Sequence, residues 1–167
     1  MTTVSTHTYT RTHTSVYVSD KLRNLLKVLV ASYGLDPKGV VDAWSDWVDH
    51  AARTWLRSGH LRAIVIEFYW PGSSDALARW DFPIRYDGVD VDEMWTDRLF
   101  FEESFPKAKA PPTKCSYRIV LTHGHDAPPI AGLTSTTFRS VKNLIAQEAG
   151  SVITTHDIMA SARYYRQ

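Results

Sequence analysis

The chain has 167 residues, of which 44% are hydrophobic and 22% are charged; this is the composition of one globular domain and excludes an intrinsically disordered protein. The 19 Lys and Arg residues are scattered and balance 18 Asp and Glu residues, so the net charge of +1 argues against direct nucleic-acid binding. Cys115 is the only cysteine, which excludes an intramolecular disulfide and a cysteine-based zinc cluster.

The N-terminal region shows no targeting or membrane signal. It lacks a basic stretch followed by an apolar core, and no apolar run reaches the roughly 20 residues of a membrane span. We therefore expect a cytoplasmic protein with no membrane partner. Residues 2–13 alternate Thr, Ser and His with few apolar side chains, which predicts at most a weak strand within an exposed, mobile segment over residues 1–13.

Two amphipathic helices are predicted next. Apolar residues recur at helical spacing from about Ser15 to Tyr33, and Gly34 supplies a left-handed stop. Asp36 as N-cap and Pro37 in the first turn begin a second helix that Gly59 ends. One face of this helix is apolar and carries Val40, Trp44, Trp47, Val48, Ala51 and Trp55.

A strand hairpin follows the helices. Residues 61–70 are apolar on both faces, which is typical of a central strand covered on two sides. Residues 71–75 have the composition of a turn, and residues 77–86 alternate between apolar and polar side chains. Pro83 cannot donate to a ladder of hydrogen bonds, so this second strand is expected at an edge.

The second half of the chain predicts further elements of both kinds, and with antiparallel strands and segregated helices the fold class is α+β. We expect a short helix at about Glu93–Phe105 and a strand at Ser116–Thr122. The remaining expected elements are a loop, a strand near Leu133–Arg139, a helical or mixed stretch near Val141–Ala149 and a strand near Ile158–Tyr165.

The sharpest catalytic candidate is His123-Gly-His125-Asp126. Two histidines separated by one residue face the same way on a strand, and with Asp126 they would hold a divalent metal in a small metal-dependent hydrolase. A polar turn between strands explains the same residues better, because no second cluster with ligand spacing accompanies them. The sequence contains no nucleophile elbow, phosphate loop or dinucleotide-binding motif. We therefore expect that the protein is not an enzyme and binds no cofactor.

The order and spacing of several short stretches resemble the bacterial HORMA domain family, the adaptors of CBASS-type antiphage signalling systems. The stretches are residues 18–27, Gly34-Leu-Asp-Pro37, Ala43-Trp44, Thr54-Trp55-Leu56, Ser58-Gly59, Ile66-Glu67-Phe68-Tyr69, Arg79-Trp80-Asp81, Phe138-Arg139-Ser140 and Ala162-Arg163-Tyr164-Tyr165.

This resemblance implies one HORMA domain over residues 1–167. Three core helices would pack on a three-stranded antiparallel sheet within about residues 14–122, followed by a C-terminal "safety belt" over about residues 123–167. The strand at 77–86 would be the edge where the belt docks. The strand at 116–122 would be the opposite, open edge.

The resemblance also implies a function. A short closure peptide would add to the open edge along Tyr117, Arg118, Ile119, Val120 and Leu121, and the belt would wrap around it. The closed form would activate a cGAS/DncV-like cyclic-oligonucleotide synthase, and an AAA+ ATPase pulling on the N-terminal segment would reset it. A binding partner with the same fold but no conformational cycle is a second alternative beside the hydrolase.

Overall fold

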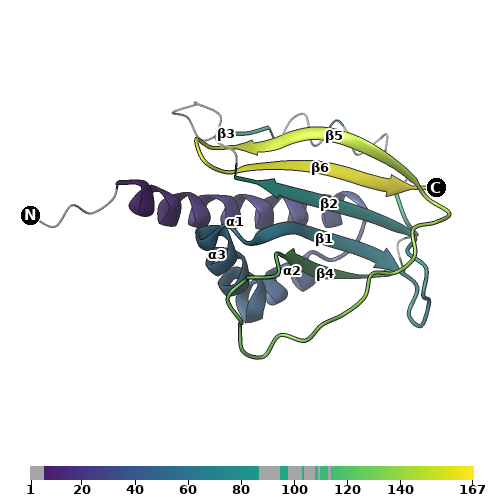
Figure 1. The fold of residues 1–167 in the computed structure, drawn as a ribbon. Coiled ribbons are helices and arrows are strands. Elements are labelled where there is room, and N and C mark those ends of the chain that lie inside the picture. The colour runs from purple at the N-terminus through teal and green to yellow at the C-terminus, as the bar shows by residue number, and fades with distance from the viewer. Residues whose placement is uncertain (1–5, 87–94, 98–102, 104–107, 109, 113) are drawn as a thin grey trace, which may run out of the picture.

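The computed structural model of the chain describes residues 6–86, 95–97, 103, 108, 110–112 and 114–167. Its strands are β1 (Leu61–Tyr69), β2 (Ala78–Arg85), β3 (Trp95–Thr96), β4 (Ser116–His123), β5 (Ile145–Thr154) and β6 (Met159–Arg166). In the described part of the chain they form one six-stranded antiparallel sheet in the order β3-β5-β6-β2-β1-β4. Helices lie against one face of the sheet, which confirms the α+β class (Figure 1).

Helix α1 (Thr6–Ser32) carries the predicted apolar face. Its fully buried side chains recur at helical spacing and include Val18, Leu22, Leu26 and Leu29. Gly34 follows with a φ of 74°, the left-handed conformation in which many helices end. The predicted start at about Ser15 is wrong, because residues 6–13 continue the helix instead of forming a weak strand. Residues 1–5 lie outside the described residues.

The second predicted helix is confirmed, with one irregular turn in its middle. Helices α2 (Lys38–Ala43) and α3 (Asp49–Ser58) are joined by a π-helical turn, η1 (Trp44–Val48). The Asp36 carboxylate accepts the Lys38 N–H at 2.9 Å at the start, and Gly59 ends α3 with a φ of 76°. None of the described helices combines the length and apolar character that a bilayer span requires.

Strand β1 is the centre of the predicted three-stranded core. It pairs with β2 on one side and β4 on the other, and Ile66 stands between Trp80 and Ile119 in register. Ile64, Ile66 and Phe68 are fully buried on the helix side, and Val65 on the opposite face is also buried, so burial on both faces explains the continuous apolar run.

Strand β2 is not an edge of the complete sheet, because β6 pairs with its outer side. The prediction that the C-terminal segment docks on this strand is confirmed. The paired residues of β2 and β6 flank Pro83 and do not include it, as its missing N–H requires.

The helix predicted at Glu93–Phe105 is wrong at its start, where Trp95–Thr96 form β3 and pair with β5. Glu103 is helical, and most of the other residues of that range lie outside the described residues.

Of the C-terminal predictions, the final strand is confirmed, the strand at residues 133–139 is wrong, and the helical or mixed stretch at residues 141–149 is mixed but not helical. Strand β6 lies where a final strand was expected. Residues 133–139 form no strand, and residues 141–149 are not helical, since β5 begins at Ile145. Below, residues 127–139 are called the crossing loop, and β5 with β6 is called the C-terminal hairpin.

Candidate functional site

A groove of the described chain lies along the outer edge of β4. This strand is the last in the sheet, and no strand of the described residues pairs with its outer side. The crossing loop leaves the end of β4, passes outside this edge and returns toward the β1–β2 turn (Figure 1). Between strand and loop is a groove of about 920 Å³.

The helices supply an aromatic wall to this groove. Trp47 of η1 and Trp55 of α3 both line it, together with Leu121 of β4 and the crossing-loop residues Ile130 and Leu133. These apolar side chains suit a ligand that buries alternate side chains between strand and loop.

Trp55 also fixes the beginning of the crossing loop. Its indole Nε1 donates a 2.8 Å hydrogen bond to the carbonyl of Pro128. Its ring packs against that of His123, with 4.4 Å between the ring centroids. The groove wall and the loop anchor are therefore the same side chain.

Four of the five predicted site residues line the groove, namely Arg118, Ile119, Val120 and Leu121. Tyr117 is not part of the lining. Its hydroxyl instead donates to the carbonyl of Asp36 at the start of α2, and burial raises the pKa of the phenol above its usual value. Tyr117 thus positions β4 against the helix layer.

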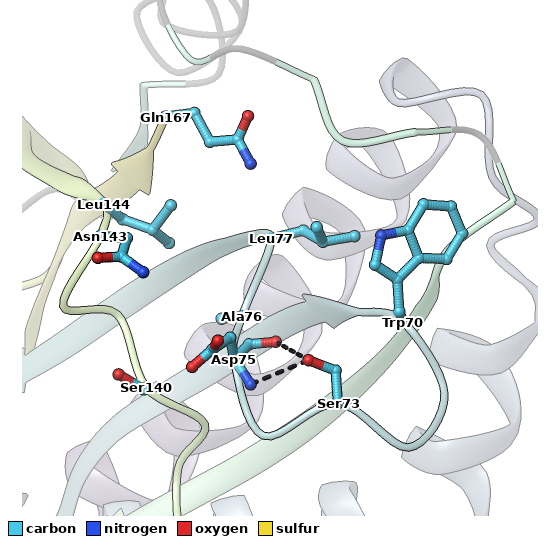
Figure 2. A pocket seen from close by; sticks show the side chains of 9 residues that line it. All are labelled: Trp70, Ser73, Asp75, Ala76, Leu77, Ser140, Asn143, Leu144 and Gln167. Carbon is cyan, nitrogen blue, oxygen red and sulfur yellow. Dashed lines mark hydrogen bonds between the residues drawn. The ribbon is translucent and has the colours of Figure 1, made fainter.

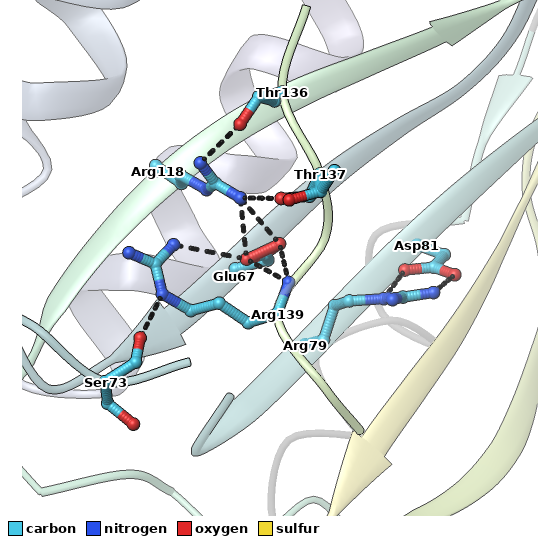
Figure 3. A network of polar contacts seen from close by, with 8 residues as sticks. All are labelled: Glu67, Ser73, Arg79, Asp81, Arg118, Thr136, Thr137 and Arg139. Carbon is cyan, nitrogen blue, oxygen red and sulfur yellow. Dashed lines mark hydrogen bonds and ion pairs between the residues drawn. The ribbon is translucent and has the colours of Figure 1, made fainter. Parts of the chain in front are cut away.

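A buried carboxylate joins β4 to the crossing loop on the other face of the sheet. Glu67 of β1 is fully buried, and Arg118 Nη2 lies 3.3 Å from each of its oxygens (Figure 3). Arg139 adds its backbone N–H at 3.2 Å and its Nη1 at 3.4 Å. Arg118 also donates to Thr136 Oγ1 at 3.0 Å and to the Thr137 carbonyl at 2.6 Å.

The end of the crossing loop is held by the β1–β2 turn. Arg139 Nε donates to the Ser73 carbonyl at 3.0 Å, and its guanidinium lies over the Tyr69 ring. Ser140 exchanges backbone hydrogen bonds with Ser74 and Ala76, each 2.9 Å long. The loop is therefore anchored at both ends, while most residues between Ala131 and Phe138 are exposed.

A second hollow of about 540 Å³ lies beside the same turn (Figure 2). The Ser73 hydroxyl accepts the Asp75 N–H at 3.1 Å, so it stabilises the turn. The same hydroxyl lies 3.3 Å from the Asp75 carbonyl, and no histidine is among the residues that line the hollow. The hollow is lined by Trp70, Ser73, Asp75, Ala76, Leu77, Ser140, Asn143, Leu144 and Gln167.

The metal site proposed at His123, His125 and Asp126 is not formed. Among the described residues, no three His, Cys, Asp or Glu side chains are grouped so that they could hold a metal ion. His123 Nδ1 lies 2.8 Å from the Gly124 carbonyl, and its ring packs against that of Trp55 at an interplanar angle of 44°. Cys115 is buried, and burial raises the pKa of its thiol, which disfavours the thiolate.

Sequence reasoning missed three residues of this region. Trp47 and Trp55 were assigned to the helix core by their spacing, although both line the groove. Glu67 had a visible signal, because it is the one charged residue within the otherwise apolar stretch Ala63–Tyr69 of β1. Such a residue is expected to be paired, and its partners come from β4 and the crossing loop.

The sequence matches the family model described as Bacterial HORMA domain 2 over residues 1–167. A comparison with curated proteins finds no significant match.

Solved structures share the fold at low sequence identity. A chain of the Mitotic Checkpoint Complex has a TM-score of 0.71 at 9% identity, over 92% of this chain and 98% of that one. The E. coli MS115-1 CdnC:HORMA-deltaN complex has a TM-score of 0.56 at 12% identity, over 92% and 87%. C. elegans HTP-1 bound to the HIM-3 closure motif has a TM-score of 0.55 at 13% identity, over 74% and 70%.

Proposed function

Since this chain belongs to the bacterial HORMA domain 2 family, we propose that it is a peptide-binding signalling adaptor of the cytoplasm. The observation that carries the proposal is the outer edge of β4, which pairs with no described strand and faces a groove closed on its outer side by a loop anchored at both ends. In this role the crossing loop and the C-terminal hairpin are the safety belt.

Strand addition is the mode of binding that fits this edge. An extended peptide would pair its backbone with β4, so that main-chain hydrogen bonds supply affinity and alternate side chains supply selectivity. Arg118, Ile119, Val120 and Leu121 line the strand side of the groove, and Trp47 and Trp55 face apolar residues of the peptide. Tyr117 holds the strand in place from the helix side.

The peptide-bound form is the signalling state in this proposal. It would bind and activate a cGAS/DncV-like cyclic-oligonucleotide synthase in a CBASS-type antiphage system. A solved E. coli complex of CdnC with a HORMA protein shares the fold of this chain and supports the choice of partner. An AAA+ ATPase would reset the adaptor. Nucleic acid and membranes are not among the proposed partners.

An N-methyl scan tests strand addition directly. A peptide selected from a displayed library against the purified protein would be resynthesised with one backbone N-methyl group at each position in turn. We expect a loss of affinity at every second position, since only alternate N–H groups of the peptide point toward β4. Equal tolerance of N-methylation at all positions would rule out strand addition.

The signalling step needs a separate assay. A synthase encoded beside this gene would be incubated with the protein, with and without the selected peptide, and cyclic-oligonucleotide formation would be measured. We expect activity only when adaptor and peptide are both present. Synthase activity that does not change when the adaptor is added would contradict the signalling role, but it would not contradict peptide binding.

A further inference from the structure

Arg11 is the first residue of α1 whose side chain is described, and it contacts a residue near the C-terminal end of the sequence. Arg11 Nε lies 2.6 Å from Asp157 Oδ2, across a separation of 146 positions. Asp157 stands in the turn between β5 and β6, and the two side chains are only 18% and 6% exposed. An ion pair this well shielded from water is screened much less than an exposed one.

The turn that carries Asp157 is unusual, because tips of hairpins normally lie in solvent. Thr155 and Ile158 are fully buried here. The Thr155 hydroxyl donates to the Ile158 carbonyl at 2.7 Å and accepts the Ile158 N–H at 2.9 Å. The turn is therefore tightly closed, and it holds the Asp157 carboxylate where water reaches it poorly.

Two further contacts join this end of α1 to the neighbouring strands. The Arg11 guanidinium lies 5.3 Å from the centre of the Tyr86 ring, and the Tyr86 hydroxyl donates to the Leu61 carbonyl at 2.8 Å. The Tyr17 hydroxyl lies 3.3 Å from Thr96 Oγ1 in β3, which pairs with β5. Figure 1 shows the β5–β6 turn at the same end of the molecule as the N-terminal half of α1.

We propose that Arg11 and Asp157 form a clasp that makes docking of the C-terminal hairpin depend on the first turns of α1 being helical. The clasp rests on the proposed function, in which this hairpin is the belt that must leave β2. Unwinding of α1 as far as Arg11 withdraws the guanidinium from a carboxylate that is only 6% exposed and whose other polar neighbours are His156 and the Thr155 hydroxyl. The pairing of β6 with β2 then weakens.

Hydrogen exchange of the full chain, followed by mass spectrometry, tests the clasp. Arg11→Ala should speed exchange in β5 and β6 by roughly tenfold or more relative to β1, because the buried Asp157 carboxylate loses its ion-pair partner. In the double variant R11A/D157A, β5 and β6 should exchange more slowly than in Arg11→Ala, because the unpaired carboxylate has been removed. Lys38→Ala is the matched control, since its pair with Asp42 is exposed.

The result has two readings. Selective acceleration in the hairpin, with partial recovery in the double variant, supports the clasp. Unchanged exchange in the hairpin, or equal acceleration in β1 and in the hairpin, overturns it. No peptide enters the measurement, so failure of peptide binding refutes the proposed function alone, and an unaffected hairpin in a protein that binds peptides refutes the clasp alone.

Discussion

Glu67 shows how one residue can decide the position of a loop. Its carboxylate is fully buried and meets three donor groups of Arg118 and Arg139. Glu67→Gln keeps the size of the side chain but removes the charge that both arginines neutralise. We expect a loss of about 2 kcal/mol in the free energy of unfolding, measured by urea titration.

Two comparisons make this prediction specific. Glu67→Gln should also speed proteolysis within the crossing loop, because Arg118 and Arg139 join that loop to the carboxylate. Lys38→Ala breaks an exposed ion pair of the same charge type and should leave the urea midpoint unchanged. Wild-type stability in Glu67→Gln would show that the cluster contributes nothing net.

Tyr33 gives a prediction for alkaline pH. Its hydroxyl accepts the Trp80 indole N–H at 2.8 Å, and burial raises the pKa of Tyr33 from 10.0 to about 12. Since the folded chain keeps the phenol neutral where the unfolded chain ionises it, stability is fully present below pH 10 and falls between about pH 10 and 12. Tyr33→Phe should reduce the slope of unfolding free energy against pH by about 1.4 kcal/mol per unit in this window. An identical slope in both proteins, measured by urea titrations from pH 9 to 12, would contradict it.

At the scale of secondary-structure elements, the contact between α2 and β4 leads to a prediction about Gly39. A Cβ atom at Gly39 would meet Tyr117 Oη at 2.5 Å and Cζ at 2.9 Å, so the strand and helix approach closely only because this residue is glycine. Gly39→Ala should cost about 1–2 kcal/mol through overpacking. In a Tyr117→Leu background the same change should be neutral or stabilising by up to about 1 kcal/mol, since alanine favours a helix. Thermal unfolding of the four proteins gives the coupling; additive effects would exclude the clash.

The elements that were predicted correctly from the sequence are those in which buried apolar residues recur at the spacing of a helix or a strand. Helix α1 and strands β1 and β2 place large apolar side chains at helical or alternating spacing, and they were found within a few residues of their ends except at the start of α1. Strand β5 was missed because its first four residues, Ile145–Glu148, are exposed on both faces. The strand expected at residues 133–139 has strand-like composition, but it pairs with no strand of the described residues and lies within the crossing loop.

The candidate site was predictable only in part, because it is made by contacts between distant segments. The open edge of β4 followed from the resemblance and was confirmed as the end of the sheet. The pairing of Glu67 with Arg139 spans 72 positions, and nothing local in either sequence stretch specifies it. Two stretches that carried the family resemblance, Ile66–Tyr69 and Phe138–Ser140, thus meet in space.

At the scale of the whole molecule, the anchored crossing loop constrains how a peptide enters. The loop is held at Pro128 by Trp55 and at Arg139 by Glu67. If the proposed function holds, a closure peptide would lie along β4 only after one of these anchors opens. The observed association rate, followed with a fluorescent peptide selected as above, should therefore level off at the opening rate as peptide concentration rises.

Loosening one anchor should raise that plateau. Trp55→Phe keeps the aromatic wall of the groove but removes the indole N–H that donates to Pro128. Because a neutral hydrogen bond contributes about 1 kcal/mol, opening should become roughly fivefold faster. The dissociation rate should rise with it, since the peptide leaves by the same opening. An association rate that grows linearly with peptide concentration in both proteins would show that the groove fills without the loop moving, and the belt would then serve no gating role.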